Sequence, residues 1–98
     1  MPDNNAPKYL LLEIYERNAD EIGRYPDLDS ARSAMRQAFK DYLEDNLRFA
    51  PGDPLYDDIC AKLDAGISFG EPLDYGVEPM RIWCDMRSRE IDWKIIAL

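Results

Sequence analysis

A single apolar stripe between residues 28 and 43 constrains the fold of this 98-residue chain more than any other feature. Its members recur at steps of three and four, which places them on one face of an α-helix. They are Leu28, Ala31, Met35, Ala38, Phe39, Tyr42 and Leu43. Asp27 precedes the stripe, and its carboxylate is suited to cap the free amides of a first helical turn. The pattern predicts a helix that begins near Asp27 and ends before Pro51, with one face against a core.

A second, shorter helix is predicted after Asp53, because a capping residue followed by Pro54 is a common helix start. Its apolar edge comprises Leu55, Ile59, Cys60 and Leu63, and Gly66 is a natural C-terminal stop. Residues 67–79 contain two glycines and two prolines. We therefore expect a loop there, with a brief extended piece at residues 67–69.

The remaining apolar segments favour β-strands. Residues 8–16 are rich in aliphatic and aromatic residues, and alternation separates Leu10, Leu12 and Ile14 from Tyr9, Leu11, Glu13 and Tyr15. A turn at residues 18–20 and a returning strand at 21–25 are expected to follow. Residues 80–86 alternate between Met80, Ile82, Cys84 and Met86 on one face and Arg81, Trp83 and Asp85 on the other. In residues 90–96 we expect Ile91, Trp93 and Ile95 to face inward, from a strand that lies inside the sheet.

Together these segments predict a β-β-α-α-β-β order, a two-layer α+β domain with a roughly four-stranded antiparallel sheet and helices on one face. Residues 8–98 form this single domain, and the polar residues 1–7 are expected to be a disordered leader. The tyrosine- and leucine-rich first strand, the capped helix with Ala31 and Met35, and the closing segment 92–96 resemble small uncharacterised α+β proteins of Gram-positive gut bacteria and their mobile elements. The resemblance implies this fold and a bacterial origin, and it implies no activity.

The residue inventory argues against catalysis. The chain contains no histidine, the commonest general base and zinc ligand. Cys60 and Cys84 occupy apolar positions and are too few and too far apart for a disulfide framework or a zinc site. No segment approaches the roughly 18 apolar residues that cross a membrane, and the N-terminus has no secretory signal pattern. We therefore expect a cytoplasmic, non-enzymatic protein without a cofactor or metal.

Acidic residues are concentrated between residues 41 and 78, where ten carboxylates face only Arg48 and Lys62. This segment has a net charge of −8, which is the net charge of the whole chain. If these carboxylates lie on one side of the molecule, they would form a surface for a basic partner that includes Asp53, Asp57, Asp58 and Asp64. We then expect these four aspartates to be mostly exposed and to lack close basic neighbours from elsewhere in the chain. A surface that serves only solubility is the alternative. The three aspartates from 53 to 58 do not have the spacing of a calcium loop.

A second candidate site lies on the C-terminal hairpin, where Arg81, Arg87 and Arg89 accompany an exposed or half-exposed Trp83. Arginine beside an aromatic residue is typical of protein interfaces and of nucleic-acid surfaces. The acidity of the chain opposes direct binding to a phosphate backbone. Packing of Trp83 on the sheet is a further interpretation.

These features favour a protein–protein interaction or self-association module that uses the sheet surface or the acidic face. One alternative is an acidic accessory inhibitor of a nucleic-acid-binding partner, of the phage or mobile-element type and anti-CRISPR-like in size and charge. A small enzyme with a carboxylate site is the least favoured alternative, since nothing singles out two of the twenty carboxylates. We expect no direct contact with nucleic acid or membrane.

Overall fold

Capping aspartates begin both helices of the computed structural model, which describes residues 7–68, 74–86 and 89–98. Helix α1 (Leu28–Asp45) follows Asp27, whose carboxylate accepts a hydrogen bond from a first-turn amide at 2.7 Å. Helix α2 (Pro54–Asp64) follows Asp53, which accepts from a first-turn amide at 3.1 Å. Gly66 then adopts the left-handed conformation, with φ of 74°, that ends many helices. Both predicted helices are confirmed together with their caps.

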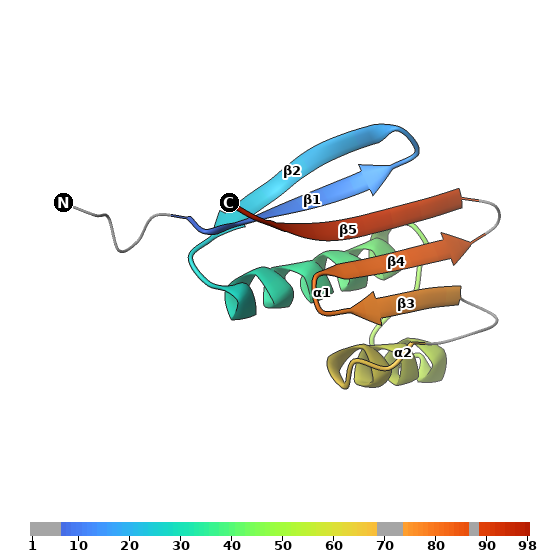
Figure 1. Cartoon of the computed structure of the whole chain (residues 1–98). Coiled ribbons are helices and arrows are strands. Elements are labelled where there is room, and N and C mark those ends of the chain that lie inside the picture. Colours follow the sequence, from blue (N-terminus) through green and yellow to red (C-terminus); the bar gives the residue numbers. More distant parts are fainter. Residues whose placement is uncertain (1–6, 69–73, 87–88) are drawn as a thin grey trace.

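Five strands form one antiparallel sheet in the spatial order β2-β1-β5-β4-β3 (Figure 1). They are β1 (Tyr9–Tyr15), β2 (Asn18–Tyr25), β3 (Asp74–Glu78), β4 (Arg81–Met86) and β5 (Arg89–Ala97). Strand β5 lies between β1 and β4, which confirms its predicted place inside the sheet. The element order is therefore ββααβββ, an α+β fold with one strand more than expected.

Strand β3 is the additional element, and it lies within residues that were predicted to form a loop. Gly76 lowers the intrinsic preference of this segment for a strand. However, the adjacent Tyr75 is only 1% exposed, because it packs into the core. On the opposite face the indole of Trp83 covers Gly76 so closely that a methyl group there would collide with it. Packing on both faces thus stabilises a strand that local propensity disfavours.

The turn between β1 and β2 differs from the prediction, and parts of two predicted segments lie outside the described residues. The β1–β2 hairpin turns at residues 16–17, with Glu16 at a φ of 57°, so the predicted turn at 18–20 is wrong. The register shifts opposite Leu11 and Leu12 and leaves Ile22 unpaired as a bulge. Residues 1–6 of the predicted leader and Phe69 of the predicted extended piece lie outside the described residues.

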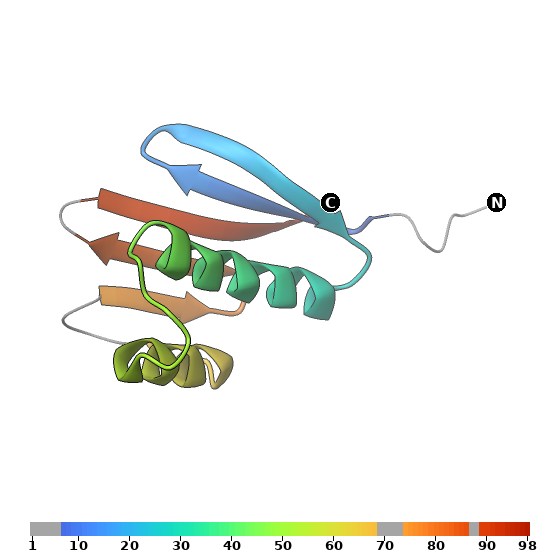
Figure 2. The ribbon, with the colours of Figure 1, turned by 180° about the vertical axis from the view of Figure 1, so that it is seen from behind.

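The core lies between the helices and one face of the sheet (Figure 2). Phe39 of α1 is central: its ring centroid lies 5.2 Å from that of Tyr75 and 5.4 Å from that of Trp93, the latter in an edge-to-face contact. The inward orientation predicted for Ile91, Trp93 and Ile95 is confirmed. The other buried apolar residues are Leu11, Ala31, Met35, Leu43, Tyr56, Ile59, Leu63, Ile82 and Cys84. Neither helix combines the length and the hydropathy that crossing a membrane requires, as far as the described segments extend.

Candidate functional site on the helix-free face of the sheet

The two faces of the sheet have different surroundings, because both helices pack against the same face and no described helix covers the other (Figure 1). Paired residues of antiparallel strands point to the same side, and successive residues alternate. The register therefore defines the bare side, here called the open face. Its residues are Ala19, Glu21, Arg24, Leu10, Leu12, Ile14, Glu90, Asp92, Lys94, Ile96, Arg81, Trp83, Asp85, Asp74, Gly76 and Glu78.

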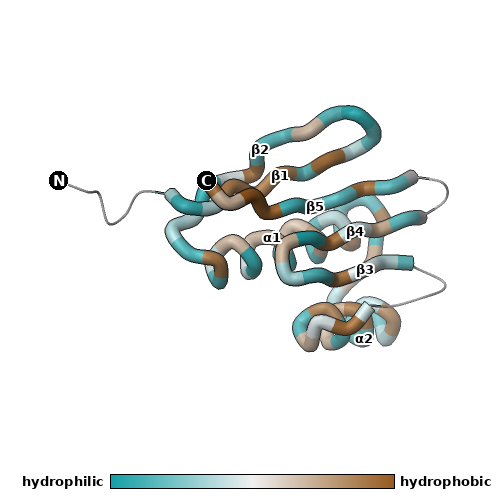
Figure 3. Tube along the Cα trace, in the orientation of Figure 1, coloured by the Kyte–Doolittle hydropathy of each residue, from teal (hydrophilic) through white to brown (hydrophobic). Residues whose placement is uncertain are grey.

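An apolar strip crosses the open face along β1. It comprises Leu10, Leu12 and Ile14, together with Ile96 of β5, which lies directly opposite Leu10. The three β1 residues are half-buried, yet they do not belong to the apolar set that packs with the core. Ile96 is 38% exposed. Figure 3 shows the apolar and polar positions that follow one another along these strands. A contiguous apolar surface of this kind marks an interaction site more often than an isolated apolar residue does.

Trp83 is the aromatic residue of the open face and is half-buried. It projects from β4 and covers Gly76 of the neighbouring strand β3. On its other side it lies directly opposite Asp92 of β5. Trp83 therefore packs on the sheet, with its indole against the backbone of β3 and part of its surface exposed to solvent.

Arg81 is held by carboxylates rather than free to bind an external anion. Its Nη2 lies 2.7 Å and its Nε 2.9 Å from Oδ1 of Asp92. Glu78 approaches Nη1 at 3.7 Å, and Glu90 approaches Nη2 at 4.0 Å. Three carboxylates thus surround one guanidinium, and the group as a whole is negative. This arrangement opposes a role for Arg81 in binding phosphates.

The structure does not bring Arg81 and Arg89 together. The backbone of Arg89 pairs with Met86 at one end of the β4–β5 hairpin, whereas Arg81 pairs with Lys94 at the other end. The side chain of Arg89 and the whole of Arg87 lie outside the described residues. Only Arg81 and Trp83 of the predicted hairpin site are therefore placed on one surface.

Three carboxylates form a row across the open face, here called the carboxylate row. Asp74 lies directly opposite Asp85, and Asp85 lies directly opposite Glu90. Among the side chains that the structure describes, no basic group lies within ion-pair distance of Asp74 or Asp85. Burial is the largest cause of a raised pKa of about 12 for the Cys84 thiol, and the nearby charges of Asp85 and Asp74 contribute to this value in the same direction. Like charges that face each other across strands are destabilising, so the row does not serve the fold.

Among the described residues that the register places on the open face, acidic side chains outnumber basic ones. The six carboxylates are Glu21, Asp74, Glu78, Asp85, Glu90 and Asp92, and the three basic residues are Arg24, Arg81 and Lys94. The difference is a net charge of −3 next to the apolar strip.

The aspartates of the predicted acidic face serve α2 and its surroundings. Asp53 caps the helix and is half-buried. Asp57 is exposed, and its Oδ1 accepts a hydrogen bond from the backbone N–H of Gly52 at 3.3 Å. Asp58 is also exposed and lies 3.3 Å from Nζ of Lys62, one turn further along the same helix. Asp57 and Asp58 therefore remain accessible from solvent.

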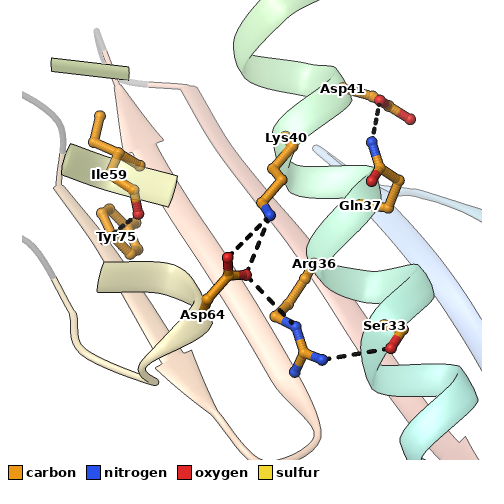
Figure 4. A network of polar contacts seen from close by, with 8 residues as sticks. All are labelled: Ser33, Arg36, Gln37, Lys40, Asp41, Ile59, Asp64 and Tyr75. Atoms are coloured by element: carbon orange, nitrogen blue, oxygen red, sulfur yellow. Dashed lines mark hydrogen bonds and ion pairs between the residues drawn. The ribbon is translucent and has the colours of Figure 1, made fainter. Parts of the chain in front are cut away.

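Asp64 differs from the sequence-based expectation (Figure 4). Its carboxylate binds Nζ of Lys40 at 3.1 Å and lies 4.0 Å from Nε of Arg36, and both partners belong to α1. The expectation that these aspartates lack basic neighbours from elsewhere in the chain is therefore wrong for Asp64. Its side chain is 56% exposed and joins the two helices. The reason is the antiparallel approach of α1 and α2, which a sequence pattern does not reveal.

A pocket of about 300 Å³ lies where α1, the end of α2 and the β3–β4 turn meet. Arg32, Arg36, Asp64 and Glu78 line it, so its charges balance. Arg32 is held by a hydrogen bond from its Nε to the carbonyl oxygen of Pro79 at 2.8 Å. Of its two carboxylates, Asp64 is already paired with Lys40 and lies beside Arg36.

Both cysteines are free thiols in apolar surroundings, with Cys84 buried and Cys60 half-buried. Burial raises the pKa of each, which disfavours the reactive thiolate. In the described ranges no three or more acidic or cysteine side chains are grouped as a metal site.

The apolar strip was not identified from the sequence. Alternation in residues 9–15 separates two faces, but it does not say which of them the helices cover. One feature of the sequence could have indicated the strip: the aliphatic residues Leu10, Leu12 and Ile14 share one face of the strand, whereas tyrosines and Glu13 occupy the other.

Comparisons with protein-family models, curated proteins and solved structures found no match to this chain.

Proposed function

We propose that this protein is a non-enzymatic protein-binding module whose open face contacts a partner protein. The observation that carries the proposal is the apolar strip: Leu10, Leu12 and Ile14 are grouped on a sheet face that neither α1 nor α2 covers. Trp83 adds an aromatic side chain to the same face. Apolar and aromatic residues surrounded by charged ones are the usual composition of a protein interface.

The edges of the sheet are less suited to partner binding than its open face. Edge strand β2 contains the bulge at Ile22, and bulges hinder the pairing of an edge with another strand. Edge strand β3 is short, and the backbone N–H of Val77 already donates to Oγ of Ser68 at 3.1 Å. Strand addition, a common way to recruit an extended peptide, is therefore disfavoured at both edges.

The proposal can be tested by affinity capture from lysate of the cells that encode the protein. The open-face variant combines Leu12→Gln with Ile14→Gln, which keep side-chain length but remove apolar surface. The matched control combines Asp57→Lys with Asp58→Lys on α2, which leaves the open face intact. We expect the wild type and the α2 control to capture the same protein, and the open-face variant to lose it while retaining its melting temperature.

The α2 control also tests the second candidate function, an acidic inhibitor of a nucleic-acid-binding partner. Exposed Asp57 and Asp58 are the observation that favours it. Loss of the captured protein through the α2 reversals alone, with capture by the open-face variant intact, would support that function and contradict the open-face proposal. Capture of no specific protein by the wild type would contradict both.

A further inference from the structure

We infer that the partner of the open face is basic as well as apolar, and that a cationic side chain of that partner lies against Trp83 beside the carboxylate row. This inference rests on the proposed function and adds the chemistry of the partner. It is carried by charge complementarity on a face that also offers an apolar strip and an aromatic ring.

The first step is the sign of the charge. The described residues of the open face carry a net charge of −3, and Arg81 is already surrounded by Asp92, Glu78 and Glu90. Two copies of this chain would therefore bring like charges together if their open faces met. A partner with basic residues would gain attraction where a second copy would be repelled.

The second step is the position of Trp83. Asp85 lies two residues further along β4 on the same face, and Asp92 lies directly opposite Trp83 on β5. Arg81 binds Asp92, whereas no described basic side chain pairs with Asp85. An arginine or lysine that contacts the indole can therefore also reach the Asp85 carboxylate. A cation over a tryptophan ring is attracted by the ring electrons, and a nearby carboxylate adds to this attraction.

The third step is the effect of the carboxylate row on the fold. Asp74, Asp85 and Glu90 face one another across three strands, an arrangement that destabilises the free protein. A bound cation would remove this repulsion. The inference therefore predicts opposite effects of neutralising the row: a more stable free protein and a weaker complex. A row that serves only solubility predicts the gain in stability without the loss of binding.

The test uses two synthetic peptides, an amidated acetyl-Leu-Arg-Leu-Arg and its counterpart with neutral citrulline in place of arginine. The chain has two tryptophans, so NMR resolves two indole N–H signals, one from Trp83 and one from buried Trp93. We expect the arginine peptide to shift the Trp83 signal and leave the Trp93 signal in place, and the citrulline peptide to bind several-fold more weakly. Added salt should reduce the difference between the peptides.

Variants complete the test. Asp85→Asn should raise the melting temperature and weaken binding of the arginine peptide about threefold or more. The control Asp58→Asn removes the same charge from α2 and should leave that binding unchanged. Equal binding of both peptides, an unmoved Trp83 signal, or unchanged binding in Asp85→Asn would overturn the inference. If both peptides bind equally and Leu12→Gln abolishes their binding, the inference fails while the proposed function stands. If both peptides still bind to the Leu12→Gln protein as they do to the wild type, the proposed function itself is contradicted.

Discussion

Trp93 donates a hydrogen bond from its indole Nε1 to Oε1 of Glu13 at 3.0 Å, and the two residues lie directly opposite each other in β5 and β1. Trp93 is fully buried beneath α1. Its indole N–H is a polar group that needs a partner in this position, and Glu13 provides the acceptor. This bond explains why β1 turns the face with a charged residue toward the helices and leaves Leu10, Leu12 and Ile14 on the open face.

Removing the acceptor should destabilise the protein more than removing the charge. Glu13→Ala leaves the buried indole N–H without its partner, and we expect the free energy of unfolding to fall by about 1–3 kcal/mol. Glu13→Gln retains an oxygen acceptor and should stay closer to the wild type. Urea unfolding of the three proteins measures both effects. Equal destabilisation by the two substitutions would show that loss of the hydrogen bond from Trp93 is not the cause of the destabilisation in Glu13→Ala.

Local signals predicted the helices well, and long-range contacts decided what the sequence left open. Asp27 and Asp53 cap their helices through amides only a few residues away, so the local sequence predicts where both helices begin. The face of β1 depends on Trp93, which is 80 residues from Glu13. Strand β3 likewise depends on the packing of Tyr75 against Phe39 of α1, in addition to the cover that Trp83 gives Gly76.

The same distinction applies to the candidate site. Alternation alone places Arg81 and Trp83 on one face of β4, as predicted. The carboxylate row could not be predicted from the sequence, because only the register of three strands places Asp74, Asp85 and Glu90 next to one another. The contacts of Asp64 with Lys40 and Arg36 similarly require the packing of α2 against α1.

Phe39 should be one of the most sensitive core positions. Its ring contacts those of Tyr75 and Trp93, and the residue is fully buried. Phe39→Ala should lower the free energy of unfolding by about 3–5 kcal/mol, because it leaves a cavity among the three aromatic rings. Ile22→Ala is the control: Ile22 is 41% exposed, and we expect a change within about 0.5 kcal/mol. A melting temperature for Phe39→Ala within a degree or two of the wild type would contradict this description of the core.

The protein should lose stability in alkaline solution. Burial raises the pKa of Tyr75 to about 12 from an ordinary value of 10.0, and the Asp58 charge contributes in the same direction. Because the folded protein holds the proton more tightly, this contribution is complete below pH 10 and is lost as the pH rises toward 12. Tyr75→Phe cannot ionise, so its stability should depend less on pH in this range. Denaturant unfolding at several alkaline pH values checks this, and identical pH dependence in both proteins would contradict it.

The Asp27 cap of α1 should stabilise the folded protein at neutral pH, and this stabilisation should be lost in acid. The bond from the Ser30 amide to Asp27 lowers the pKa of that carboxyl below its ordinary value of 3.8. The contribution is therefore present above this value and is lost as the pH falls through the lower, folded-state pKa. At neutral pH, Asp27→Ala should lower the melting temperature, and Asp27→Ser, which retains a capping oxygen, should lower it less. Thermal unfolding should show the gap between wild type and Asp27→Ala narrowing in acid; a constant gap would exclude the charged cap as its source.

The central claim is that the open face binds the partner, and the dissociation constant of the captured partner tests it most directly. The Leu12→Gln, Ile14→Gln protein should bind at least about tenfold more weakly than the wild type, as expected when apolar residues at the centre of an interface are replaced. The Asp57→Lys, Asp58→Lys protein should bind within about twofold of the wild type, since rim-like charges far from the contact contribute little. Wild-type affinity in the open-face variant, at an unchanged melting temperature, would contradict the claim.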